Sequence, residues 1–206
     1  MYEDPTYSTS ASPMPRMKVN VVLNDMSKTF FLVDEWYSKE ELENVWKEID
    51  FLTDFTKMNL DDDQMLSINL DESYRVPSIS NILSYRYKEK LELFANQIDR
   101  SFPEGTADDF LQCKKLESKL GYFHQAMGLH NHKSQDKFVS YLFLTREENT
   151  FDGGDLFLSN QKVKMHNTRL AFFPGEYERK ISPILFKDVK RTLGNGLYLI
   201  KTTYNK

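Results

Sequence analysis

The sequence predicts an α+β protein in which helices come first and strands make up the second half. Two observations predict this. Apolar residues recur at helical spacing in segments before residue 112, and from Leu116 onward short apolar runs alternate with turn-forming residues. A chain of 206 residues, 40% of them hydrophobic, is long enough for one domain with a substantial core. We therefore expect a single domain over residues 17–206.

The N-terminal region begins with a polar segment, which two candidate strands follow. Met1–Arg16 is rich in Ser and Pro and has no hydrophobic period. This composition indicates a flexible tail, or an arm that becomes ordered on a partner. Met17–Leu23 and Thr29–Val33 have the composition of strands, and Asn24 and Asp25 between them predict a turn.

Ser38–Leu52 is the clearest predicted helix. Ser38 and Glu41 have the spacing of a capping box, in which each side chain accepts a hydrogen bond from the other residue's backbone N–H. The apolar residues of this segment share one helical face: Leu42, Val45, Trp46, Ile49 and Leu52. We expect this face to pack on a sheet as core.

One loop and two further helices are predicted before the strand-rich half. Thr53–Pro77 is irregular and acidic, which favours a solvated loop, with a lid over a pocket as the alternative. Ser80–Phe102 has apolar residues on one helical face and ends at a Pro-Glu-Gly sequence. Thr106–Leu111 predicts a short helix.

The segment Gly121–Leu156 contains the residues best suited to chemistry. Its first residues have the composition of a strand, and the pair His130 and His132 follows. The apolar run Phe138–Leu144 comes next, and the segment ends with Phe151–Leu156, which includes two adjacent glycines. Residues i and i+2 of a strand point to the same face, so the two imidazoles could share one metal ion. The glycines permit positive φ and read as determinants of the fold.

Composition argues against several classes of protein. A net charge of −4 and a pI near 5.6 leave no global basic field for nucleic acid. The single Cys113 excludes an internal disulfide framework and reads as a half-buried apolar residue. No apolar run approaches membrane-spanning length. We expect a soluble cytoplasmic protein whose partner is a protein or peptide, in an oligomer or larger assembly. The amino-acid usage is typical of an AT-rich genome, and a phage virion component is therefore the alternative.

The order of these pieces resembles the Fe(II)/2-oxoglutarate-dependent dioxygenases, in particular their prolyl-4-hydroxylase-like branch. The resemblance covers about Phe30–Ile200. It rests on Tyr122 eight residues before His130, on Gly153-Gly154-Asp155-Leu156, on Leu170–Ile184, which is similar to the strand of the distal metal-binding His, and on Arg191–Tyr198, which is similar to the strand of the 2-oxoglutarate-binding Arg. The resemblance implies a double-stranded β-helix (jelly-roll) core with the N-terminal helices packed on one sheet.

The metal-binding positions depart from that family. Its triad is His, then Asp or Glu, then a distal His, and the matching positions here are His130, His132 and Arg179. A guanidinium stays protonated and has no lone pair to give a metal ion. Two interpretations of Arg179 remain open: with Lys180 it replaces the cation electrostatically, next to His132 or a nearby Glu, or it is simply solvated.

Further candidate residues follow from the same comparison. If His130 and His132 bind a metal, a carboxylate must supply the third ligand, and the candidates are Asp136, Glu176 and Glu178. Otherwise the imidazoles simply form hydrogen bonds in a polar pocket. His124 and His166 read as ordinary strand or turn residues.

The resemblance also implies residues for the cosubstrate. Arg191 would form a bidentate ion pair with the distal carboxylate of 2-oxoglutarate, and Tyr122 would donate its hydroxyl to the same group. A purely structural ion pair of Arg191 is the alternative.

Three functions therefore compete. The first is a 2-oxoglutarate/Fe(II) dioxygenase-like protein of the prolyl hydroxylase type with a degenerate active site and little or no activity. The second is a non-enzymatic binding or assembly module on the same fold. The third is an active oxidoreductase with an atypical His-x-His site, using Fe(II) and 2-oxoglutarate. The loss of two aligned ligands favours the first two, whereas the retention of Tyr122 and Arg191 favours the third.

Overall fold

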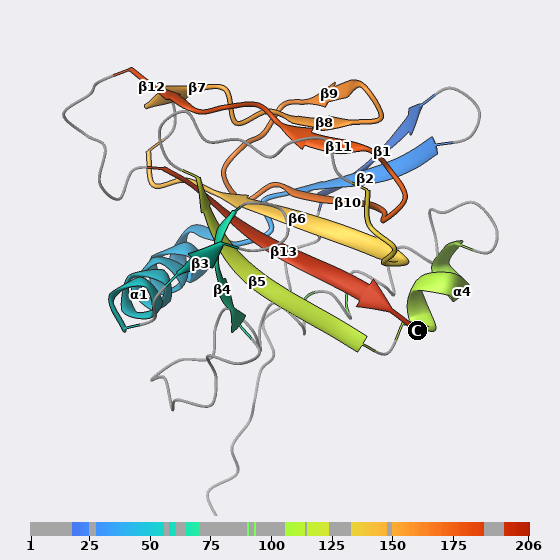
Figure 1. Cartoon of the computed structure of the whole chain (residues 1–206), viewed down its shortest axis with the longest axis horizontal. Helices are drawn as coiled ribbons and strands as arrows, with labels where there is room; N and C mark the ends of the chain where they lie inside the picture. Colours follow the sequence, from blue (N-terminus) through green and yellow to red (C-terminus); the bar gives the residue numbers. More distant parts are fainter. Residues whose placement is uncertain are drawn as a thin grey trace, which may run out of the picture.

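The computed structural model describes residues 18–24, 28–55, 58–60, 65–70, 90, 93, 106–113, 115–123, 133–147, 150–187 and 196–206. Their strands form an eight-stranded sheet, a three-stranded sheet and a two-stranded pair (Figure 1). The three-stranded sheet lies over one face of the large sheet, and helix α1 (Lys39–Phe55) packs on the other. Two facing sheets, with a helix on the outer face of the larger one, are the layers of a double-stranded β-helix.

All neighbouring strands are antiparallel. The large sheet has the order β1 (Lys18–Asn24), β2 (Lys28–Asp34), β10 (Leu170–Pro174), β6 (Phe138–Leu144), β13 (Leu197–Asn205), β5 (Lys115–Phe123), β4 (Leu66–Asn69) and β3 (Asn59–Leu60). The small sheet has the order β11 (Arg179–Ile181), β8 (Leu156–Leu158) and β9 (Gln161–Val163). The pair consists of β12 (Leu185–Phe186) and β7 (Phe151–Asp152).

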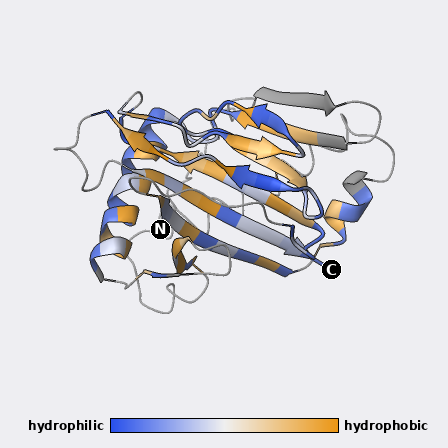
Figure 2. Cartoon of the chain, turned by 45° about the horizontal axis from the view of Figure 1, so that its top comes forward, coloured by the Kyte–Doolittle hydropathy of each residue, from blue (hydrophilic) through white to orange (hydrophobic). Residues whose placement is uncertain are grey.

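The core has two parts, one on each face of the large sheet. Leu142 and Leu144 of β6 belong to the part beneath α1, whereas Tyr141 and Phe143 belong to the part between the two sheets. Successive residues of a strand point to opposite faces. Because both faces are covered, every residue of β6 is buried, and this explains why its sequence is apolar except for Ser140. Strands along which hydrophobic and hydrophilic positions alternate are also visible in the structure (Figure 2).

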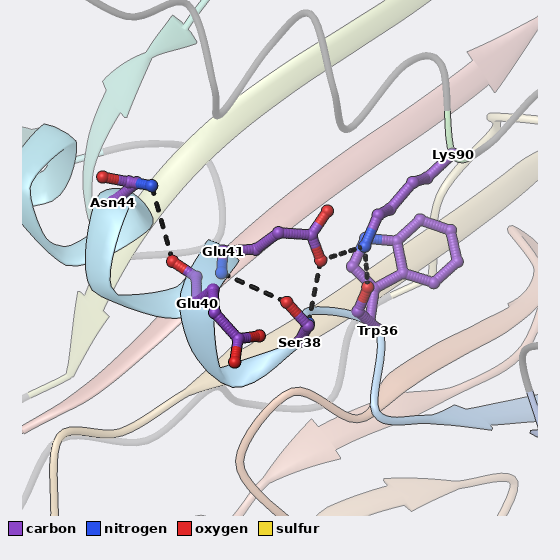
Figure 3. Close-up of polar contacts among 6 residues, drawn as sticks. All are labelled: Trp36, Ser38, Glu40, Glu41, Asn44 and Lys90. Atoms are coloured by element: carbon purple, nitrogen blue, oxygen red, sulfur yellow. Dashed lines mark hydrogen bonds and ion pairs between the residues drawn. The ribbon is translucent and has the colours of Figure 1, made fainter. Parts of the chain in front are cut away.

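Helix α1 begins at the predicted capping box. The backbone N–H of Ser38 donates to Glu41 Oε2 (2.8 Å), and that of Glu41 donates to Ser38 Oγ (3.2 Å; Figure 3). The ammonium of Lys90 donates to the same Glu41 oxygen (2.8 Å) and to the carbonyl of Trp36. The apolar stripe packs on the large sheet, as predicted. The helix continues to Phe55, three residues beyond its predicted end.

Other predictions in the first half have mixed outcomes. The two N-terminal strands are confirmed as β1 and β2, and the short helix as α4 (Thr106–Leu111). The solvated loop Thr53–Pro77 is wrong in part, because β3 and β4 lie within it and β4 pairs with β5, which buries Ser67 and Ile68. Of the predicted helix Ser80–Phe102 only Lys90 and Leu93 are described, and both are helical.

Two predictions in the second half need correction. Leu170–Ile184 is not one strand but two, β10 in the large sheet and β11 in the small one, separated by a turn at Gly175. The strand expected over Arg191–Tyr198 begins only at Leu197. Arg191 itself lies outside the described residues.

The glycine pair before β8 behaves as predicted. Gly153 has φ +85° and Gly154 has φ +68°, a region that residues with a Cβ rarely adopt. A Cβ on Gly153 would lie 1.9 Å from the carbonyl oxygen of Pro183. The close approach of these two backbones therefore requires glycine at position 153. No helix of the described part of the chain is long and apolar enough to span a membrane.

Candidate functional site

Arg179 lies in the space between the two sheets. It is the first residue of β11, and its side chain is 0% exposed. Its Nε donates to the hydroxyl of Tyr141 (2.7 Å) and its Nη1 to the carbonyl of Gly175 (3.4 Å). Its Nη2 has no hydrogen-bond partner among the described residues. The solvated alternative for Arg179 is therefore wrong.

The register of the small sheet explains this placement. Arg179 pairs with Leu158 of β8 and Ile181 pairs with Leu156, and all four residues are buried. Lys180, between them, is exposed because alternate residues of a strand point to opposite faces. Arg179 and Ile181 lie on the same face of β11. The alternation that places Ile181 in the core therefore also places the permanently charged guanidinium of Arg179 there.

The charge of Arg179 has only neutral partners among its described hydrogen bonds, a hydroxyl and a carbonyl. Pairing with the neighbouring glutamates does not occur in the described contacts: Glu178 is exposed and pairs with Lys133 (3.3 Å), and Glu176 is exposed. A buried cation costs several kcal/mol unless a negative group compensates it. The arrangement is therefore suited to attract an anion.

Two lysines occupy the same face of the large sheet as Tyr141. In the strand register, Lys201 of β13 lies opposite Tyr141 of β6, and Lys119 of β5 lies opposite Lys201. Directly opposite residues of antiparallel strands point to the same side. Both lysines are half-buried. Together with Arg179 they give this side of the sheet positive charge.

Tyr122 lies on the other face of the sheet. Its ring packs 4.8 Å from that of Tyr198, which in turn contacts Trp46 of α1 (5.5 Å). Burial raises the pKa of Tyr198 to about 12. The structure does not bring Tyr122 into the space that holds Arg179, and its role toward a cosubstrate stays a prediction.

Most of the remaining predicted ligands lie outside the described residues. His124, His130 and His132 lie outside the described residues, as does Arg191. Asp136 is half-buried and accepts hydrogen bonds from Ser134 and from Asn205 Nδ2 (2.7 Å). No group of three or more His, Cys, Asp or Glu side chains gathers within the described parts of the chain. The described residues alone therefore do not fit an Fe(II) ion.

Sequence reasoning missed Tyr141, Lys201 and Lys119. Tyr141 lies inside an apolar run, and the lysines look like ordinary solvated residues. Their common face follows only from the pairing of three strands. His166 is exposed and lines a separate cavity, whereas Cys113 is half-buried as predicted, and burial raises the pKa of its thiol.

Comparison with known proteins gives structural relatives. No protein-family profile matches the sequence, and no curated protein matches it. A Pseudomonas putida prolyl-4-hydroxylase superposes with a TM-score of 0.61 at 14% identity, over 86% of this chain and 92% of that one. The viral collagen prolyl hydroxylase of Paramecium Bursaria Chlorella virus-1 gives 0.55 at 11% identity, over 85% and 94%.

A third structure points the same way. A 2OG-Fe(II) oxygenase family oxidoreductase from Burkholderia pseudomallei superposes with a TM-score of 0.55 at 11% identity, over 85% of this chain and 84% of that one. At such identities the likeness concerns the fold. The arrangement of facing sheets described above is thus shared with these proteins over most of their length. The chain has the double-stranded β-helix fold of prolyl-4-hydroxylases and 2OG-Fe(II) oxygenases.

Proposed function

We propose that this protein is a non-catalytic binding module with the prolyl hydroxylase fold, and that the space between its sheets takes a small carboxylate ligand. The observation that carries the proposal is the fully buried guanidinium of Arg179, whose Nη2 has no hydrogen-bond partner among the described residues. Buried donors nearly always have a hydrogen-bond partner, so a buried cationic donor without one is consistent with a site for an anionic ligand.

The position of Arg179 supports the loss of metal chemistry. By resemblance to the dioxygenases it stands where the distal metal-binding His is expected, three residues before Ser182-Pro183-Ile184. A guanidinium offers only donors and a fixed positive charge. The second position holds His132 in place of a carboxylate. A site that would bind a cation in an oxygenase would here attract a negative group.

A carboxylate is the anion that best fits these residues. The planar guanidinium fork binds two carboxylate oxygens at once. The hydroxyl of Tyr141 is held against Arg179, and Lys119, on the same face of the sheet, would favour a second negative group. A dicarboxylate such as 2-oxoglutarate is therefore the first ligand to test, bound without a metal ion.

The test is calorimetric titration of the full chain with 2-oxoglutarate, with and without anaerobic Mn(II). We expect binding that a chelator does not change, and no release of succinate when Fe(II) and O₂ are supplied. Arg179→Met should weaken binding by about 10- to 100-fold, the value of one charge-assisted contact. Lys180→Met, which removes an exposed charge from the adjacent position, should leave the affinity unchanged.

Either of two results would overturn the proposal. Stoichiometric metal that tightens 2-oxoglutarate binding and is lost in His130→Ala would mean an active oxygenase with a His-x-His site. Equal affinities of the wild type and Arg179→Met, or no detectable carboxylate binding, would remove Arg179 from any ligand site.

A further inference from the structure

A cavity lies near the end of β6, next to the glycine turn before β8. Its volume is about 370 Å³. It is lined by the end of β6, the glycine turn before β8, residues 164–167 after β9 and Leu197 at the start of β13. Arg179 contacts a different part of the same face: its Nη1 donates to the carbonyl of Gly175 and its Nε to the hydroxyl of Tyr141. Arg179 does not line the cavity, but the ring of Tyr141 lies 6.2 Å from that of Phe143, which does.

Apolar side chains form part of the cavity wall. Phe143 and Leu197 belong to the core between the sheets, and Phe151 and Met165 are half-buried against it. The ring of Phe151 is supported edge-on by Phe186, with 6.1 Å between the ring centroids. Aromatic and thioether groups make favourable contacts with flat apolar ligands. The wall is therefore suited to the apolar body of a small molecule.

The lining contains two aspartates and two lysines, but the ion pairs around it leave one of these lysines without an ion-pair partner among the described residues. Asp152 pairs with Lys187 (3.1 Å), and Asp155 pairs with Lys162 (2.7 Å), which does not line the cavity. Both carboxylates are therefore neutralised. Lys164 and His166 also line the cavity, and neither forms an ion pair with any other described residue. The lining thus carries positive charge that the described part of the protein does not compensate.

The segment that carries Lys164 and His166 is held in place. Arg169 donates through Nη1 to the carbonyl of Lys164 (2.6 Å) and through Nη2 to Asp34 (2.9 Å). The side chain of Asn167 accepts from the backbone N–H of Thr145 (3.1 Å). Opposite it, the N–H of Gly154 donates to the carbonyl of Ser182 (3.2 Å). A wall fixed in this way loses little conformational entropy when it binds a ligand.

We propose that this cavity is a second binding site, for a small aromatic monoanion whose flat body contacts the apolar wall and whose acidic group lies at Lys164 and His166. Cavities of this size that combine an apolar wall with a few polar groups are typical small-molecule sites. Arg179 is not among the residues that line this cavity, and the proposal does not depend on the function proposed for Arg179.

The probe is 8-anilinonaphthalene-1-sulfonate, followed by its fluorescence and by amide chemical shifts of the full-length protein. We expect saturable binding to one site, with the largest shifts at Gly153, Gly154 and residues 164–167. Lys164→Glu should weaken binding by about tenfold or more, since it reverses the unpaired charge. Lys180→Glu makes the same charge change on β11 and should leave the affinity unchanged. Met165→Trp, which fills the cavity, should abolish binding.

The readouts separate this site from that of Arg179. Excess 2-oxoglutarate should not displace the probe. Equal affinities for Lys164→Glu and Lys180→Glu, or shifts that centre on Arg179 and Tyr141, would overturn the proposal. The far-ultraviolet spectrum and melting curve of each variant show whether it is folded, and an unfolded Met165→Trp would leave the comparison of the two lysine variants to decide.

Discussion

Arg179 is a charged residue enclosed among apolar side chains, and its effect on stability can be separated from its effect on binding. Without ligand, Arg179→Met replaces an uncompensated buried cation by an apolar side chain of similar length. We expect the free energy of unfolding in urea to stay the same or rise by about 1–2 kcal/mol. Arg179→Ala should instead lower it by about 2–4 kcal/mol, because it leaves a cavity. A loss of about 3 kcal/mol or more in Arg179→Met would indicate a carboxylate partner in the native protein.

Gly153 and Gly154 are adjacent and both have positive φ, but they differ in the space available for a Cβ, so their alanine variants can be compared directly. Gly153→Ala would place a Cβ 1.9 Å from a backbone oxygen, in addition to the strain of a φ of +85°. We expect it to lower the free energy of unfolding by more than about 2 kcal/mol. Gly154→Ala, with its nearest contacts at 3.3 Å from side-chain atoms, should cost only about 1 kcal/mol of left-handed strain. Urea denaturation of both variants measures these losses. Equal losses of unfolding free energy would mean that the backbone at Pro183 shifts at little cost.

At the scale of elements, the side chain of Ser38 stabilises the N-terminus of α1, and a substitution by alanine removes only its hydroxyl. Ser38→Ala deletes the hydroxyl that accepts the N–H of Glu41, and we expect a loss of about 1 kcal/mol in the free energy of unfolding. Asn44→Ala is the control: its exposed side chain only donates to a carbonyl of its own helix (3.4 Å), and alanine favours helix. Thermal or urea denaturation in which both variants lose the same stability would contradict a specific cap.

Several elements could be predicted because their signals are local. The capping box and the apolar stripe identify α1, and the continuous apolar run identifies β6. The strands β3 and β4 were missed because they are short and lie around the acidic residues 61–63; their stability comes from pairing with β5, which the local sequence does not report. The sequence of Leu170–Ile184 predicts one strand because apolar residues lie on both sides of Pro174-Gly175, yet the chain turns there.

The candidate site was only partly predictable for a related reason. Arg179 could be singled out by its position relative to Ser182-Pro183-Ile184, but its burial depends on the pairing of β11 with β8. Tyr141, Lys119 and Lys201 come from three strands that are distant in sequence, and only their register brings them to one face. Tyr122 was expected beside the cosubstrate, but strand alternation turns it toward α1.

For the whole molecule, the arrangement of layers separates structural from ligand-binding functions. The face of the large sheet under α1 is filled by aromatic and aliphatic side chains, including an aromatic cluster of Phe110, Phe138, Phe172 and Tyr204, in which most rings meet edge to face or tilted. The face toward the small sheet carries both the buried charge of Arg179 and the cavity lined by Phe143. Both proposed sites therefore lie in the space between the sheets, while the α1 side provides a core that neither ligand needs to disturb.

This arrangement predicts how hydrogen exchange varies over the molecule. β6 lies between β10 and β13, and β13 lies between β6 and β5, so both strands are paired on two sides and covered on both faces. Their amides should exchange only by global unfolding, whereas those of the edge strands β1 and β3 should exchange by local opening, orders of magnitude faster. Exchange followed by mass spectrometry measures this, and equal rates for β13 and β1 would contradict it.

Because ligands suppress local opening where they bind, 2-oxoglutarate should slow exchange in β11 and the adjoining turn at Gly175, whereas the aromatic anion should slow it at residues 153–156 and 164–168. Protection of the same peptides by both ligands would mean that the barrel has one site and not two.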